Sequence, residues 1–189
     1  MEDILRQIAV FADNAHGEQV RKYAPERYIA HPIRVMKSCM RYTTDVSVLS
    51  AALLHDVLED TPVSKEAMKD FLLTLMSPPL VEKTISLVIE LTDVYVKSSY
   101  PALNRRQRKN KELDRLEKTS PHSQTIKYAD IIDNTMEIVA QDPDFAKVYL
   151  YECRAILRKL KKGNMDLYNE AVRTVDEAIL SLTGDKSSS

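Results

Sequence analysis

The sequence predicts an all-α fold, and two observations support this. Apolar residues recur at spacings of three and four through most of the chain, as on the buried face of an amphipathic helix. The 189 residues include three glycines, which leaves little material for the tight turns of β-hairpins. The length suits a chain that buries its own core. We expect a single domain over residues 1–184 and a disordered tail over residues 185–189.

Start and stop signals mark out the expected helices in chain order. The first helix runs from Ile4 to near His16, where Gly17 suits the residue after a helix end. Proline favours the first turn of a helix, and capping side chains favour the position before it. These signals place helix starts at Pro32, Asp45 or Thr44, Ser64, Pro78, Ser120–Pro121 and Asp142–Pro143. The last two helices are expected over residues 143–161 and 164–182.

The most informative stretch is an apolar helix that ends in His55, Asp56, Glu59 and Asp60, with Pro62 marking its end. Acidic side chains are unfavourable at a helix C-terminus, because the macrodipole already places partial negative charge there. In one helix, His55 and Glu59 lie one turn apart, and so do Asp56 and Asp60. Such a group needs a positive partner, and a divalent cation would supply it. The alternative is a solvated helix end with His55 as a hydrogen-bonded core residue.

Two further side chains complete a candidate metal site. His31 lies just before Pro32, at the expected mouth of a helix, where a histidine is well placed to bind an ion. Asp130 lies in an otherwise apolar helical stretch, with Asp133 and Asn134 on nearly the same face. Because a buried carboxylate without a partner is unfavourable, we expect Asp130 to bind a cation. The predicted metal ligands are His31, His55, Asp56 and Asp130.

The order of these ligands along the chain resembles the HD superfamily of metal-dependent phosphohydrolases. The wider motifs are YIAHP over 28–32, HDVLEDT over 55–61 and KYADIIDN over 127–134. They are similar to the RelA/SpoT hydrolase branch, including its small single-domain alarmone hydrolases. The resemblance covers roughly residues 5–140. It implies a compact HD-domain helical bundle that removes the 3′-pyrophosphate from guanosine tetra- or pentaphosphate.

The metal and the catalytic groups follow from the same motifs. Two imidazoles and two carboxylates suit a divalent ion such as Mn²⁺, although zinc, nickel or iron could occupy the site in vitro. The resemblance points to manganese. It also assigns the catalytic role to Glu59 and Asp60, as groups that orient water and return a proton to the leaving oxygen. Which of the two is the general acid stays open.

The substrate-binding residues are expected on two segments. Arg21 and Lys22 resemble the basic pair of the family, where the arginine stacks on a nucleobase. Lys127 and Asn134 match family positions that line the nucleotide site. The chain departs from the family pattern at Arg27, where proline is expected, and at Asp133 and Met136, which replace a common aromatic and a common basic residue. These departures suggest altered phosphate selectivity.

Three functions therefore stay open. The first is an alarmone hydrolase, which the intact Glu59–Asp60 pair favours. The second is an HD enzyme that acts on another phosphorylated nucleotide, such as a nicotinamide dinucleotide phosphate or a cyclic nucleotide, which the altered base loop favours. The third is a catalytically inactive HD sensor or scaffold. The complete set of candidate ligands and acids argues against this third function.

Composition narrows the class of protein further. A net charge of −1 gives no reason to expect binding to nucleic acid or to a membrane. The basic run over residues 104–111 is interpreted as a solvated helix face, with steering of an anionic substrate as the alternative. No signal peptide or membrane-spanning run is recognisable. Cys39 and Cys153 are expected as buried reduced thiols of a cytoplasmic protein. The oligomeric state is not readable.

Overall fold

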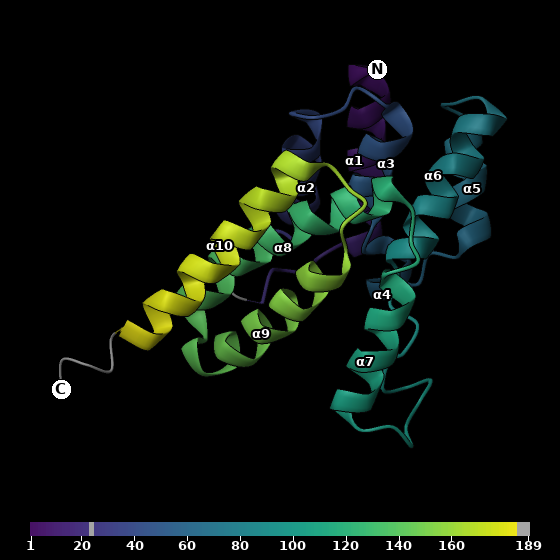
Figure 1. The fold of residues 1–189 in the computed structure, drawn as a ribbon. Coiled ribbons are helices and arrows are strands. Elements are labelled where there is room, and N and C mark those ends of the chain that lie inside the picture. The colour runs from purple at the N-terminus through teal and green to yellow at the C-terminus, as the bar shows by residue number, and fades with distance from the viewer. Residues whose placement is uncertain (23–24, 185–189) are drawn as a thin grey trace. The chain divides into compact units, whose positions relative to one another are not determined.

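The computed structural model describes residues 1–22 and 25–184, and over these residues the fold is helical (Figure 1). One isolated β-bridge joins Val20 and Arg27. The prediction of an all-α fold is thus confirmed. The chain divides after Thr92 into two compact units. The single domain over residues 1–184 stays a prediction, and the expected tail over residues 185–189 lies outside the described residues.

The first unit is built around its third helix. Its helices are α1 (Glu2–His16), α2 (Ala30–Met40), α3 (Val46–Leu54), α4 (Val57–Asp60), α5 (Lys65–Leu73) and α6 (Pro78–Leu91). Helix α3 packs against α1, α2 and α6, and all of its residues from Ser47 to Leu54 are buried. A helix that is apolar on every side belongs in a core. Its first turn is capped by Asp45, whose carboxylate accepts a 2.9 Å hydrogen bond from the Ser47 amide.

The second unit is built around its longest helix. It contains α7 (Arg105–Leu116), α8 (Pro121–Gln141), α9 (Pro143–Lys159) and α10 (Met165–Gly184). Helix α8 packs against α9 and α10, and α7 packs against α9. The expected caps are present, because the Ser120 and Asp142 side chains accept hydrogen bonds from the amides of Ser123 and Phe145. The Tyr128 hydroxyl donates a 3.0 Å bond to the Leu160 carbonyl and so ties α8 to the end of α9.

The turn between α9 and α10 requires its glycine. A Cβ at Gly163 would lie 2.5 Å from the Tyr128 ring and 2.8 Å from the Thr125 amide nitrogen. Contacts this short do not occur between real side chains, so only glycine lets the turn approach α8 so closely. The predicted break between the last two helices is confirmed at this position.

The sequence interpretation was wrong about the helix that carries the His-Asp pair. Helix α3 ends at Leu54, His55 is its C-terminal capping residue, and a separate turn of helix begins at Val57. Asp56 therefore lies at the junction of two helices rather than on one. The macrodipole of a single long helix does not account for the gathered acids, because Glu59 and Asp60 belong to the short α4.

Candidate metal centre and active site

His31 enters the site from the start of α2. It lies in the first turn of that helix, and its side chain is 1% exposed. Pro32 follows it and is also buried, so the first turn is held in the core of the first unit. The Nε2 atom of His31 lies 3.6 Å from Oδ2 of Asp56. The predicted placement of this histidine at a helix mouth is confirmed.

His55 and Asp56 occupy the break between α3 and α4. The Nδ1 atom of His55 lies 2.8 Å from the Ala52 carbonyl oxygen. A carbonyl can only accept, so Nδ1 carries the proton and a neutral ring keeps its lone pair on Nε2. This bond also satisfies a carbonyl near the end of α3, where the helix itself no longer supplies a donor. The alternative of a hydrogen-bonded core histidine therefore holds for Nδ1, which bonds to the backbone. The other ring nitrogen, Nε2, faces Asp56.

The donor atoms of His31, His55 and Asp56 lie within 4.8 Å of one another. His55 Nε2 is 3.1 Å from Asp56 Oδ2, the same oxygen that faces His31. A nitrogen lone pair and a carboxylate oxygen repel at this distance unless a proton or a metal ion is shared between them. Two imidazole nitrogens and one carboxylate are ligands that divalent transition metals accept. Three of the four predicted ligands are thus brought together, and the residues fit a metal ion.

Tyr28 joins this cluster to the predicted catalytic acids. Its hydroxyl donates to Oδ2 of Asp56 at 2.8 Å and to Oδ2 of Asp60 at 2.9 Å. Loss of solvent and the nearby charge of Asp56 raise the pKa of the Asp60 carboxyl. The sequence interpretation placed Tyr28 in a motif but gave it no role. The signal that could have found it is its position three residues before His31, within one turn of the ligand.

The two predicted acids are consecutive residues of the short helix α4. Glu59 and Asp60 are exposed residues of α4, and Asp60 contacts Tyr28. The backbone amides of both residues donate to the Asp56 carbonyl, at 3.2 Å and 2.9 Å. Helix α4 therefore starts on the ligand residue itself, which fixes the acids close to it in sequence and in space. Their catalytic role stays a prediction.

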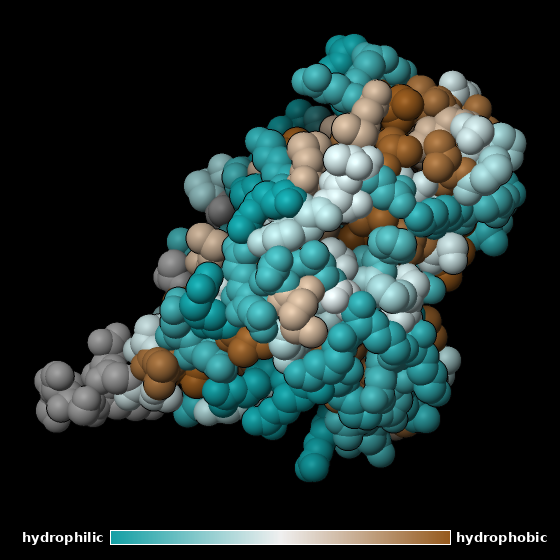
Figure 2. Space-filling view, turned by 45° about the horizontal axis from the view of Figure 1, so that its top comes forward, coloured by the Kyte–Doolittle hydropathy of each residue, from teal (hydrophilic) through white to brown (hydrophobic). Residues whose placement is uncertain are grey.

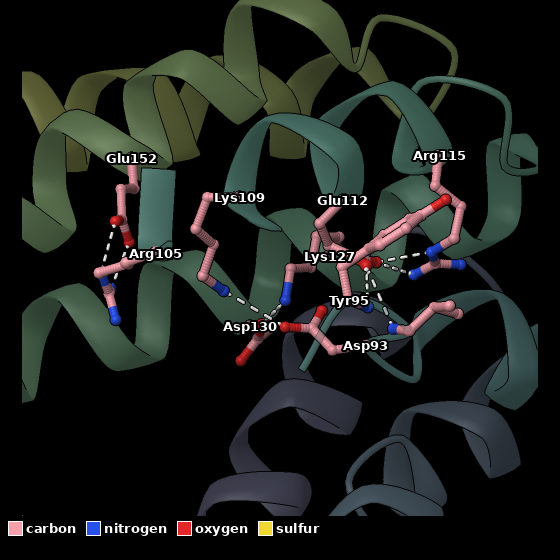
Figure 3. Close-up of polar contacts among 10 residues, drawn as sticks. Asp93, Tyr95, Arg105, Lys109, Glu112, Arg115, Lys127, Asp130 and Glu152 are labelled. Atoms are coloured by element: carbon pink, nitrogen blue, oxygen red, sulfur yellow. Dashed lines mark hydrogen bonds and ion pairs between the residues drawn. The ribbon is translucent and has the colours of Figure 1, made fainter. Parts of the chain in front are cut away.

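Asp130 lies on α8, in the second unit, and is 5% exposed. Its Oδ2 accepts a 2.8 Å bond from the Lys127 ammonium (Figure 3). Its Oδ1 accepts a 2.6 Å bond from the Asn134 amide. The positive partner expected for this buried carboxylate is thus a lysine of the same helix. Lys127 and Asn134, two of the four residues predicted to bind substrate, both contact Asp130. Its place among the metal ligands stays a prediction.

Arg21 and Lys22, the other predicted substrate-binding pair, are the last two residues of the first described stretch, residues 1–22. The Arg21 guanidinium carbon lies 5.4 Å from the centre of the Tyr28 ring. Arg27, one of the departures from the family pattern, forms a 3.1 Å ion pair with Asp13 and donates to the Gly17 carbonyl. Base stacking by Arg21 stays a prediction.

The second unit contains a cavity of about 190 Å³ beside Lys127. Arg105 and Lys109 of α7 also line it, and both are already engaged. Arg105 forms two hydrogen bonds with Glu152, and Lys109 contacts Asp93 at 3.2 Å (Figure 3). The surface over α7 is mostly hydrophilic (Figure 2). The interpretation of the basic run as a helix face is consistent with these contacts, which sequence spacing could not foresee.

Within the part of the chain that the structure describes, no helix is both long enough and apolar enough to cross a membrane. Cys39 and Cys153 are buried free thiols, as predicted, and burial raises the pKa of each to about 12.

Met136, another departure from the family pattern, is exposed on α8, whereas Asp133 is half-buried there.

The family model of the HD domain matches residues 28–135, which include all four predicted ligands. The guanosine-3′,5′-bis(diphosphate) 3′-pyrophosphohydrolase MESH1 of Drosophila melanogaster is 33% identical over 139 residues, covering 70% of this chain and 68% of the relative. The bifunctional (p)ppGpp synthase/hydrolase SpoT of Escherichia coli K12 is 43% identical over 65 residues, which are 34% of this chain. A similar match to the Vibrio cholerae pyrophosphohydrolase is 45% identical over 64 residues. These two matches span 9% of the relatives' own length.

Two solved structures resemble the chain. One, described as a metazoan ortholog of SpoT that hydrolyzes ppGpp, has a TM-score of 0.73, 26% identity and 94% coverage of both chains. The other, from Listeria monocytogenes EGD-e, has a TM-score of 0.61 at 19% identity, covers 84% of this chain and 99% of that one, and so shows the fold alone. The HD-domain match includes the clustered histidines and aspartate, and the similarity to MESH1 covers most of the sequence. The chain therefore belongs to the HD-domain family.

Proposed function

We propose that this protein is a manganese-dependent hydrolase that removes the 3′-pyrophosphate from guanosine tetra- and pentaphosphate. The observation that carries the proposal is the cluster of His31, His55 and Asp56 donor atoms within 4.8 Å of one another. The substrate is supported by the named activity of MESH1, which matches most of this chain. The solved structure of a metazoan ppGpp hydrolase supports it as well.

The proposed ligands are Nε2 of both histidines, a carboxylate oxygen of Asp56, and Asp130 as the fourth residue. When bound, a divalent ion lowers the pKa of a coordinated water and polarises a phosphoryl oxygen. The ligands are nitrogen and oxygen atoms without a thiolate, a set that manganese accepts. Zinc, nickel and iron accept it too, so the identity of the metal is decided by measurement.

The side chains around the ligands supply the remaining chemistry. Glu59 and Asp60 would take a proton from the attacking water and return one to the leaving ribose oxygen. The Arg21 guanidinium would stack on the guanine base. Lys127 and Asn134, which contact Asp130 in this structure, would contact the nucleotide instead and leave the Asp130 carboxylate to the metal.

The test is a product analysis with the full chain. Metal is removed with a chelator, Mn²⁺ is restored, and guanosine tetraphosphate is supplied. We expect one water to be consumed, with guanosine diphosphate and pyrophosphate formed in equal amounts and no reaction before metal is restored. Asp56→Asn, which keeps the shape of the ligand but removes its charge, serves as the inactive control. The absence of pyrophosphate with manganese, zinc, nickel and iron alike would reject the proposal.

A second candidate is an HD phosphohydrolase for a different phosphorylated nucleotide. The observation in its favour is the base loop, where Arg27 replaces an expected proline and is tied to Asp13 and to the Gly17 carbonyl. The same assay therefore includes a nicotinamide dinucleotide phosphate and cyclic nucleotides. Strong activity on one of these, with none on the guanosine tetraphosphate, would replace the first candidate by the second.

A cytoplasmic location remains part of the proposal. It is supported by Cys39 and Cys153, which are buried and unbridged, as expected for a reducing compartment. A small phosphorylated nucleotide is the expected partner, and binding to nucleic acid or membranes is not expected from the net charge of −1.

A further inference from the structure

Tyr28 lies among the proposed site residues of the first unit. Its hydroxyl reaches both the ligand Asp56 and the acid Asp60, at 2.8 Å and 2.9 Å. The hydroxyl contacts Oδ2 of Asp56, which also faces both histidines. A rotation of this carboxylate would therefore break the tyrosine contact and move a donor atom of the metal cluster at the same time.

The ring of Tyr28 is held by stacked side chains. His16 stacks on it with ring centres 4.3 Å apart and planes 23° apart, and the His16 side chain is buried. Nδ1 of His16 lies 2.9 Å from the Gln19 side-chain oxygen, which fixes the imidazole in place. The Arg21 guanidinium lies 5.4 Å from the centre of the Tyr28 ring. The ring is thus buttressed by α1 and in turn supports the arginine expected to meet the base.

We propose that Tyr28 is a positioning residue that fixes Asp56 for metal binding and Asp60 for proton transfer through its hydroxyl, and Arg21 for the nucleotide base through its ring. The proton-transfer and base parts rest on the proposed function. The metal part does not, because it concerns the geometry of one ligand. Hydrogen-bond partners that orient metal ligands contribute roughly 10- to 100-fold to metal affinity or activity.

The first experiment measures metal affinity without any substrate. The full chain, stripped of metal, is titrated with Mn²⁺ and followed by electron paramagnetic resonance. We expect Tyr28→Phe to weaken Mn²⁺ binding roughly tenfold or more, since Asp56 loses its orienting donor. Tyr42→Phe is the matched control, because its hydroxyl accepts a 3.0 Å hydrogen bond from Arg41. Equal Mn²⁺ affinity of Tyr28→Phe and the wild type would overturn the metal part, whatever the substrate is.

The second experiment separates the hydroxyl from the ring by kinetics at saturating Mn²⁺. Tyr28→Phe should lower kcat roughly tenfold or more and leave KM within about twofold, because the ring still supports Arg21. Tyr28→Leu lacks the ring and should raise KM as well. If the hydroxyl acts through Asp60, adding Tyr28→Phe to Asp60→Asn should cost little beyond Asp60→Asn alone. Full additivity of the two losses would overturn the proton-transfer part, and an unchanged KM in Tyr28→Leu would overturn the base part.

His16 provides a rescue test. His16→Ala removes the stacked ring and should weaken Mn²⁺ binding in the same direction as Tyr28→Phe, whereas His16→Phe keeps a flat partner and should restore it. A thermal melt of each variant shows whether the chain is folded. Equal Mn²⁺ affinity of both His16 variants would show that the stacked His16 ring does not hold Tyr28 in place for metal binding. A wild type that binds Mn²⁺ but leaves guanosine tetraphosphate intact would reject the proposed function, while the titrations would still decide the metal part.

Discussion

Each of the two units of the chain holds a predicted metal-binding carboxylate, and the two carboxylates have different neighbours. In the first unit, Asp56 faces two imidazole nitrogens, at 3.1 Å and 3.6 Å. In the second unit, Asp130 is bonded to the ammonium of Lys127 and the amide of Asn134. Asp56 lies at a helix junction, whereas Asp130 lies within the long helix α8.

This difference shows that a buried carboxylate does not by itself identify a metal ligand. A neutral imidazole offers a lone pair, so a histidine beside a carboxylate completes a site for a cation. A lysine offers only protons and a positive charge, so it satisfies the carboxylate and competes with a metal. The neighbours of Asp56 therefore support its proposed place as a metal ligand, whereas at Asp130 the Lys127 ammonium competes with a metal ion.

The largest expected effect is the loss of a ligand. Asp56→Ala should abolish hydrolysis and deplete the bound metal, because a removed carboxylate leaves the ion with too few ligands. Asp130→Ala should also abolish hydrolysis and deplete the metal if a metal ion replaces Lys127 as the partner of the Asp130 carboxylate. Elemental analysis of the purified variants measures both. Full metal occupancy in Asp130→Ala, with depletion in Asp56→Ala, would limit the metal site to the first unit.

The next effect concerns the two acids of α4, which we expect to act beside the metal without binding it. Glu59→Gln and Asp60→Asn should keep the metal and lower kcat roughly 100-fold or more, the usual scale for a lost general acid or base. Single-turnover kinetics on metal-loaded protein measure the effect. Wild-type turnover in both variants would remove the acids from the mechanism, and metal loss in either would make that residue a ligand.

The sequence predicted the helices better than it predicted the connections between them. Helix starts at Ser64, Pro78, Ser120 and Asp142 were readable because proline and capping side chains act within one turn. The break after Leu54 was not readable. No glycine or proline stands there, and the turn is stabilised by the His55 ring, which bonds back to the Ala52 carbonyl.

For the candidate site, the sequence indicated the ligand residues but not most of the contacts between them and their neighbours. Histidine and aspartate types at motif spacing indicated His31, His55 and Asp56, and the structure brings them together. Tyr28 contacts Asp56 and Asp60, which follow it in the sequence by 28 and 32 positions. No local sequence pattern encodes such distant pairs. The ammonium partner of Asp130 lies three residues away on the same helix, so helical spacing alone could have suggested it.

A smaller effect tests the balance of charge at Asp130. Lys127→Gln should destabilise the metal-free protein by about 2 kcal/mol, or about 4–8 °C in Tm, because a buried carboxylate loses its ammonium. Lys159→Gln is the control, since Lys159 pairs with Asp114 and Glu117 at an exposed surface, where such pairs contribute about 0–1 kcal/mol. Melting curves with and without Mn²⁺ measure both. If Asp130 binds metal, Mn²⁺ should raise the Tm of Lys127→Gln more than that of the wild type; equal shifts would contradict its place in the site.

The smallest effect separates base recognition in the first unit from phosphate contacts in the second. Arg21→Ala should lower kcat/KM for the true nucleotide about ten- to thirtyfold and spare a simple phosphodiester that lacks a base, because only the stacking partner is lost. Arg21→Lys keeps the charge but not the plane, so stacking predicts a similar loss, whereas charge attraction alone predicts nearly full activity. An equal loss on the base-free ester would assign Arg21 to phosphate binding instead. Base recognition would then have to come from residues outside this segment, and the Tyr28 ring would support a phosphate contact rather than a stack.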